Sequence, residues 1–269
     1  MTFRPKSGNH AIVEVVFGLV LRRPFTPTEM EALALAHDRW KDQLPRLGRT
    51  AVLQVLLGEQ PASTVQSIQP VSGVSFERIK PDGNVEWRLR ADERRFVVNC
   101  LNYESWSTIW PRARGYLADA CQIALGSDNS ITGLLLQYID VFEWTSNPAN
   151  YRLDALLSRG SPFVPESLWD KGPRWHLHEG WYRQDNLPVA GRLLERLHIN
   201  GVLDNLGRPT VKMDAYLALE LEKAQSSATF FGNSAPEIDR LFDELHDLQK
   251  GLMRGYLTKE MAQRIGLNA

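Results

Sequence analysis

The C-terminal half of the chain contains three long runs in which apolar and polar residues alternate, and this feature constrains the fold more than any other. The runs cover residues 173–184, 190–203 and 208–224, and the turn-forming segments DNLPV and DNLGRP separate them. Successive side chains of a β-strand point to opposite faces, so each run predicts a strand with one buried face. Three such strands joined by short turns predict an antiparallel meander.

The alternation also predicts how these strands pair. Between the first two strands we expect Trp181 opposite Leu193, Leu177 opposite Leu197 and Trp175 opposite Ile199. Between the second and third we expect Leu193 opposite Leu219, Leu197 opposite Ala215 and Ile199 opposite Met213. These pairings give the meander one apolar face, which should be part of the core.

The same register places two carboxylates on the apolar face, with Glu179 directly opposite Glu195. Two carboxylates so close together in an apolar setting cannot both ionise at low cost. The pair is therefore the candidate for acid/base catalysis or for binding a cation. A structural ion-pair network, in which an arginine or lysine neutralises the two carboxylates, is the interpretation that we favour.

The opposite face of the meander is polar, and its side chains form the candidate binding site. They are His176, His178, Tyr182, Arg192, Arg196, His198 and Asp214. We expect the first three opposite His198, Arg196 and Arg192, respectively, and favour a solvated sheet surface with cross-strand pairs as the simpler reading. No metal site is expected, because the nearest carboxylate, Glu179, points to the other face. The chain also has no GxGxxG, Walker, GxSxG or HExxH motif, so we expect no cofactor.

The remaining segments predict further strands and amphipathic helices. We expect strands at 11–22, 50–57 and 131–144, three strands within 73–101, helices at 26–44, 105–125 and 234–253, a short helix from Thr258, and a surface loop at 58–70. Within 73–101, the expected pairs are Val74 with Leu89, Phe76 with Trp87, Leu89 with Phe96 and Trp87 with Val98.

This order of elements predicts an α+β fold, with antiparallel sheet in two loosely similar halves and the helices packed on one face. The pattern breaks at residues 145–151, which suggests an N-terminal half over 1–146 and a C-terminal half over 147–269. The two halves could equally form one compact unit.

Three arginines share the polar side of the strands within 73–101. Arg88, Arg90 and Arg95, with Arg112 and Arg114 on the following helix, could contact RNA phosphates. The glutamates interspersed with them, Glu77, Glu86 and Glu93, favour a solvated face instead.

Composition excludes several classes of protein. The 31 Lys and Arg residues balance 32 Asp and Glu residues, and the net charge of -1 gives no global attraction to nucleic acid or an anionic membrane. No stretch approaches the roughly 20 apolar residues of a membrane span. Cys100 and Cys121 show no metal-binding spacing, which fits two reduced, partly buried thiols in a cytoplasmic protein.

Three further polar residues fall on apolar faces. Asp140 shares a face with Leu136 and Tyr138, so we expect a buried, hydrogen-bonded carboxylate. His37 and His246 lie on or beside amphipathic stripes, and we expect both to be structural histidines at the edge of the core.

Three segments resemble a sporadically distributed, functionally uncharacterised family of bacterial proteins of similar length. They are AIVEVVFGLVL near the N-terminus, GLLLQYID in mid-chain, and LFDELHDLQKGLMRGYLT near the C-terminus. Gln137, Asp140 and Met253 depart from the arginine, asparagine and phenylalanine that are common in that family. The resemblance implies a bacterial accessory protein whose sporadic distribution suits a defence or toxin/antitoxin-like operon.

These observations support three functional hypotheses. The first is a non-enzymatic binding protein that holds a protein partner on its sheet face or long loops and that could form a homo-oligomer such as a homodimer. The second is an enzyme or small-ligand receptor built around Glu179, Glu195 and the histidines. The third is RNA binding through Arg88, Arg90 and Arg95.

Overall fold

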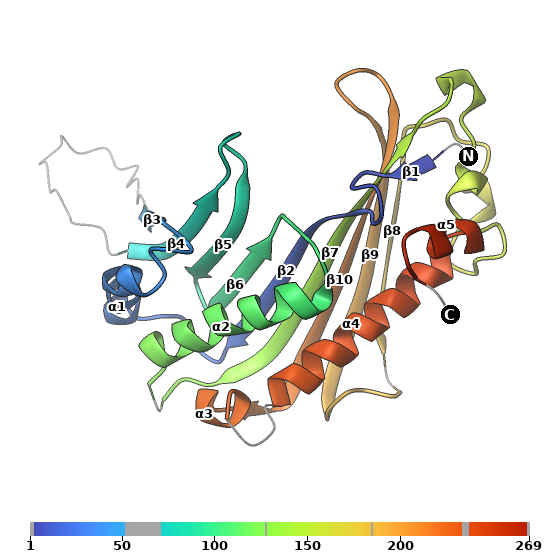
Figure 1. The fold of residues 1–269 in the computed structure, drawn as a ribbon. Helices are drawn as coiled ribbons and strands as arrows, with labels where there is room; N and C mark the ends of the chain where they lie inside the picture. Colours follow the sequence, from blue (N-terminus) through green and yellow to red (C-terminus); the bar gives the residue numbers. More distant parts are fainter. Residues whose placement is uncertain (1–2, 52–70, 127, 184, 233–236, 268–269) are drawn as a thin grey trace, which may run out of the picture.

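The fold is a single antiparallel β-sheet with helices on one of its faces (Figure 1). The computed structural model describes residues 3–51, 71–126, 128–183, 185–232 and 237–267. Nine of the ten strands follow the order β3-β4-β5-β6-β2-β7-β10-β9-β8, and β1 pairs with β7 beside that path. The α+β class with helices on one face is confirmed.

The strands are β1 (Phe3–Pro5), β2 (Ile12–Leu21), β3 (Arg46–Ala51), β4 (Val71–Ile79), β5 (Val85–Asp92), β6 (Arg95–Cys100), β7 (Ile131–Trp144), β8 (Trp175–Arg183), β9 (Gly191–Leu203) and β10 (Pro209–Gln225). The α-helices are α1 (Pro27–Leu35), α2 (Trp106–Ala124), α3 (Ser227–Phe230), α4 (Glu237–Tyr256) and α5 (Lys259–Arg264). Short 3-10 helices cover Ala36–Arg39, Pro148–Asn150, Leu153–Ala155 and Glu166–Leu168. The loop expected at 58–70, most of the strand expected at 50–57, and Ser234 lie outside the described residues.

The predicted meander is β8-β9-β10, and one of its two predicted registers is correct. Leu193 lies opposite Leu219, as expected for β9 and β10. Between β8 and β9 the prediction is wrong by two residues, because Trp181 pairs with Glu195 rather than with Leu193. The last pair of this hairpin joins Arg183 to Leu193, so the connection is longer than the predicted turn-forming segment DNLPV. A shift by two residues preserves the faces, since side chains alternate with a period of two.

The same two-residue shift occurs in the hairpins of the N-terminal half. Val74 lies opposite Ala91, not Leu89, and Trp87 lies opposite Cys100, not Val98. The predicted pairs of Phe76 and Leu89 are displaced in the same way. The turn between β5 and β6 has only two residues between the paired Asp92 and Arg95, and its centre lies one residue later in the chain than the predicted pairs imply.

Helices α1, α2 and α4 pack on the same face of the sheet, which we call the covered face (Figure 1). In α1, Thr26 and Glu29 form the predicted capping box, but the helix ends at Leu35, earlier than expected. The 3-10 helix that follows brings Trp40 into the core, where it is buried. The expected helix over 26–44 is therefore only partly confirmed.

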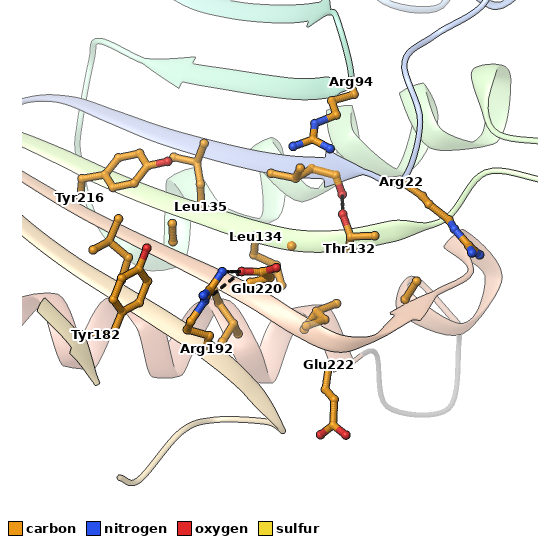
Figure 2. Close-up of a pocket in the computed structure, with 17 residues that line it drawn as sticks. Arg22, Arg94, Thr132, Leu134, Leu135, Tyr182, Arg192, Tyr216, Glu220 and Glu222 are labelled. Atoms are coloured by element: carbon orange, nitrogen blue, oxygen red, sulfur yellow. Dashed lines mark hydrogen bonds and ion pairs between the residues drawn. The ribbon is translucent and has the colours of Figure 1, made fainter. Parts of the chain in front are cut away.

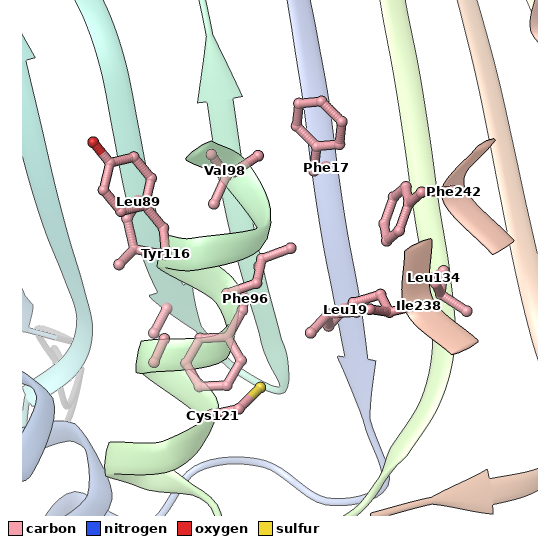
Figure 3. Packing of buried hydrophobic residues seen from close by; sticks show 14 of the residues in the cluster. Phe17, Leu19, Leu89, Phe96, Val98, Tyr116, Cys121, Leu134, Ile238 and Phe242 are labelled. Atoms are coloured by element: carbon pink, nitrogen blue, oxygen red, sulfur yellow. The ribbon is translucent and has the colours of Figure 1, made fainter. Parts of the chain in front are cut away.

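The core lies between the covered face and the helices (Figure 3). Phe17 and Leu134 of the central strands contact the layer formed by α2 and α4, and Phe242 of α4 lies 5.8 Å from the ring of Phe17. Cys100 and Cys121 are both buried and free. Strand β7 joins the two parts of the sheet, because it pairs with β2 on one side and with β10 on the other.

Candidate functional site on the uncovered sheet face

The face of the sheet opposite the helices, which we call the uncovered face, carries most of the residues selected from the sequence. His176, His178, Tyr182, Arg192, Arg196, His198 and Asp214 lie on β8, β9 and β10 of this face. Arg88, Arg90 and Arg95 lie on the same face at β5 and β6. The sequence did not reveal that these two sets share one surface, because that depends on the strand order.

The centre of the uncovered face is apolar. Val16, Val97 and Leu135 form a small buried cluster, and Tyr216 packs against it. Leu135 is only 6% exposed although no helix covers it. Gly18 makes room for it, since a Cβ atom on Gly18 would lie 2.7 Å from Leu135 Cδ2. This cluster is not among the features predicted from the sequence, where its only signal is apolar side chains at outward positions of the alternating strands.

Beside this cluster lies a groove of about 760 Å³ (Figure 2). It crosses the ends of β2, β7, β10, β9 and β8, with Arg94 contributed by the turn between β5 and β6. The outward side chains that line it are Val20, Arg22, Arg94, Leu135, Tyr182, Arg192, Leu194, Tyr216, Ala218, Glu220 and Glu222. We call this feature the groove. Of the sequence candidates, only Tyr182 and Arg192 are part of it.

The charges around the groove are partly compensated. Arg192 donates from Nε to Glu220 across the β9-β10 pair, at 3.1 Å. Arg22 and Arg94 are exposed, and neither side chain has a partner within the part of the chain that the structure describes. Considering the described residues alone, the groove therefore has one neutralised arginine, Arg192, and two arginines without an acidic partner, Arg22 and Arg94.

Two tyrosines at the groove carry arginines on their rings. The guanidinium carbon of Arg192 lies 4.9 Å from the ring centroid of Tyr182, which is 53% exposed. The guanidinium carbon of Arg196 lies 4.4 Å from the ring centroid of Tyr216. Cation–π contacts of this kind hold both partners in place and occupy one face of each ring.

The histidines pair differently from the prediction. His178 lies opposite His198, not Arg196, and the two imidazoles stack with centroids 4.4 Å apart. His176 lies opposite Asn200, and Tyr182 lies opposite Leu194 rather than Arg192. Asp214 is opposite His198, but its Oδ1 accepts a hydrogen bond from Gln137 at 2.7 Å. Among the described residues, no group of three or more His, Cys, Asp or Glu side chains is arranged to hold a metal ion.

The arginines on β5 and β6 are bound to carboxylates. Arg88 Nε lies 2.6 Å from Glu77, and Arg90 Nε lies 2.6 Å from Asp92. Arg95 lies 3.5 Å from the same Asp92. Arg112 does not extend this surface, because it lies over the ring of Trp87 on the covered face.

The glutamate pair expected on the covered face is not a directly opposed pair. Glu179 lies opposite Leu197, and Glu195 lies opposite Trp181. Glu179 accepts a short hydrogen bond from the hydroxyl of Tyr256 in α4. Glu195, which is 2% exposed, forms an ion pair with Arg183 of β8. Each carboxylate therefore has its own partner, and the cation comes from the sheet rather than from a covering helix.

Two buried polar residues on the covered face match their predicted positions. Asp140 is 2% exposed, and burial raises its pKa to about 7. Its Oδ2 has no hydrogen-bond partner among the residues described, so the expected full hydrogen bonding is absent. His246 is buried, and its Nδ1 lies 2.8 Å from the hydroxyl of Tyr138. His37 is half-buried, with Nε2 3.0 Å from the carbonyl oxygen of Leu44.

Comparison with known proteins assigns no family to this chain. No protein-family model matches it, and no curated protein matches it significantly. Within the described residues, no helix is both long and apolar enough to cross a membrane.

Proposed function

We propose that this protein is a non-catalytic binding protein that holds a protein partner on the uncovered face of its sheet. One observation carries the proposal: the helices pack on a single face, and the opposite face contains the groove together with an apolar cluster. A concave surface with an apolar centre and a polar rim has the anatomy of a protein-binding site.

The composition of the uncovered face supports a protein as the partner. Apolar side chains such as Leu135 and Leu194 lie beside both arginines and glutamates in the groove. Protein interfaces combine an apolar centre with charges of both signs at the rim. The exposed Tyr182 and the arginine on its ring also belong to the residue types that contribute most to binding energy at such interfaces.

The alternative enzyme hypothesis receives less support from the geometry. Glu179 and Glu195 do not line the groove, and both face the helices. Each is held by a single dedicated partner, Tyr256 or Arg183, as expected for structural carboxylates. RNA binding through Arg88, Arg90 and Arg95 is also disfavoured, because Glu77 and Asp92 neutralise these arginines.

Peptide display tests the proposal. A library of short random peptides is selected on the wild-type protein, and the bound peptides are then measured against Ala218→Trp, which fills the groove floor with an indole. We expect selected peptides to lose binding to this variant. Gln263→Trp adds the same side chain at an exposed position of α5 and is the matched control. If no selected peptide distinguishes the two variants, the uncovered face is not the binding surface.

A further inference from the structure

The groove combines uncompensated positive charge with an apolar floor, and this combination specifies what it can bind. Arg22 at the end of β2 and Arg94 in the β5-β6 turn lie on one side of the groove (Figure 2). Neither has an acidic partner in the described part of the chain. A guanidinium without a counter-ion at the rim of an apolar surface favours a carboxylate ligand, since it can donate two parallel hydrogen bonds to one.

The floor of the groove can bind an apolar side chain. Leu135, Leu194 and Ala218 lie next to each other on β7, β9 and β10, and Tyr216 closes one end of this surface. Arg192 is paired with Glu220. The arginines that remain to bind a ligand are therefore Arg22 and Arg94, on one side of the groove. The groove is thus asymmetric, with a cationic side and an apolar floor.

We propose that the groove binds an extended segment of a partner protein in which an aspartate or glutamate lies close to a large apolar side chain. The carboxylate binds at the side of the groove that carries Arg22 and Arg94, and the apolar side chain rests on Leu135, Leu194 and Ala218. This inference rests on the proposed function and adds the chemical class of the bound segment. From β2 to β8 the groove spans four strand spacings, or about 19 Å, which corresponds to roughly six residues of extended chain.

A nucleic acid fits the same groove less well. Sheets that bind single strands stack bases on free aromatic rings and follow the backbone with continuous positive charge. Here arginines already occupy one face of the Tyr182 and Tyr216 rings. Glu222 also lines the groove without a partner among the described residues, so the positive charge does not continue along the groove as a nucleic-acid backbone requires, whereas a single carboxylate needs only the side of Arg22 and Arg94.

Fluorescence anisotropy with defined probes tests the inference. The first probe is a short labelled peptide that contains both glutamate and leucine. In the second peptide lysine replaces each glutamate, and in the third serine replaces each leucine. A single-stranded RNA of similar length is the fourth probe. We expect only the first probe to bind well, and we expect it to bind roughly tenfold more weakly for each arginine removed in Arg22→Gln and Arg94→Gln.

The control is the double variant Arg174→Gln with Lys171→Gln, which removes two exposed cations beyond the other end of β8. It should leave the affinity for the first peptide unchanged. Equal loss in the control, equal binding of the lysine peptide, or preferred binding of the RNA would overturn the inference.

The design separates this inference from the proposed function. If display yields peptides that Ala218→Trp rejects but that carry no acidic residues and bind Arg22→Gln normally, the protein-binding face stands and the acidic ligand class is wrong. Sedimentation velocity tests whether a second copy of this chain, and not another protein, binds in the groove. A concentration-dependent dimer that Ala218→Trp abolishes would replace the foreign segment by a self-interface and would overturn the inference.

Discussion

The imidazole of His246 in α4 stacks on the indole of Trp106 in α2, with ring centroids 4.1 Å apart. The indole in turn donates a hydrogen bond from Nε1 to Asp243 of α4, at 2.7 Å. The Nδ1 atom of His246 also lies 2.8 Å from the Tyr138 hydroxyl on β7. Together, these three contacts of His246 and Trp106 connect α2 and α4 to each other and to β7 at the centre of the sheet.

Burial lowers the pKa of His246 to about 4. Because the unfolded chain takes up this proton near pH 6.5 and the folded protein does not, stability is lost as the pH falls from about 6.5 to about 4. Over this pH range, protonation of His246 in the unfolded chain lowers the free energy of unfolding by about 3 kcal/mol. Urea denaturation between pH 4 and 7 should show this contribution as the difference in slope between the wild type and His246→Gln, because Asp140 contributes an opposite slope over the same range in both proteins. An unchanged slope in the variant would place the responsible group elsewhere.

Asp140 has the opposite pH dependence. Its folded pKa is about 7, whereas an unfolded aspartate has its ordinary value near 4. Its contribution to stability is therefore complete below about pH 4 and is lost as the pH rises through about 7. We expect Asp140→Asn to stabilise the protein at pH 8 by up to about 4 kcal/mol, with little effect near pH 4. Thermal denaturation at the two pH values measures this difference, and equal effects at both would contradict the assignment.

The ion pair between Arg183 and Glu195 stabilises the meander on the covered face. Glu195 is buried, whereas Arg183 is partly exposed, with 31% of its side-chain surface accessible. Arg183→Leu leaves a buried carboxylate without a partner, and we expect a loss of about 2 kcal/mol in the free energy of unfolding, less than for a fully enclosed pair.

The double variant Arg183→Leu with Glu195→Leu should recover most of that stability, because it removes the unpaired charge. Arg192→Leu breaks the exposed pair with Glu220 and should cost much less stability than Arg183→Leu, because solvent screens an exposed ion pair. A double variant as unstable as Arg183→Leu alone would show that packing, not charge, accounts for the loss.

Gly18 and Leu135 are complementary on the uncovered face. A methyl group at position 18 would meet Leu135 Cδ2 at 2.7 Å and Cγ at 2.8 Å. We expect Gly18→Ala to destabilise the protein by about 1–3 kcal/mol through overpacking. A double-mutant cycle with Leu135→Ala should show that the two changes together cost less than their sum.

Gly251→Ala is the control for this prediction, because nothing lies within 4 Å of a Cβ atom built on that helical glycine. It should stabilise α4 by about 0.5–1 kcal/mol. If Gly18→Ala proved equally stabilising, the space beside Leu135 would be larger than the structure indicates.

The candidate site was only partly predictable. The alternation placed the histidines, Tyr182, Arg192 and Arg196 on one face, and that assignment is correct. It could not identify Arg22 and Arg94 as groove residues, because an arginine at the end of an expected strand carries no signal about which distant strands lie beside it. They reach the groove only because the strand order β6-β2-β7-β10 places the end of β2 and the β5-β6 turn near β10 in the folded sheet.

The sequence by itself determined which side chains face the core and where most helices begin. Trp175 and Trp181 pack with the core cluster and His176 is exposed, as the alternation predicts, and Thr26 and Thr258 cap their helices. These properties are local, since a period of two residues or a capping side chain needs no distant partner.

Only the tertiary structure decided which residues meet across strands. Glu179 and Glu195 have separate partners, and His178 lies opposite His198, because the β8-β9 hairpin is displaced by two residues from the predicted register. A displacement by two leaves every side chain on its face but changes every neighbour. Strand order and turn length are fixed by packing over the whole sheet, which no short segment encodes.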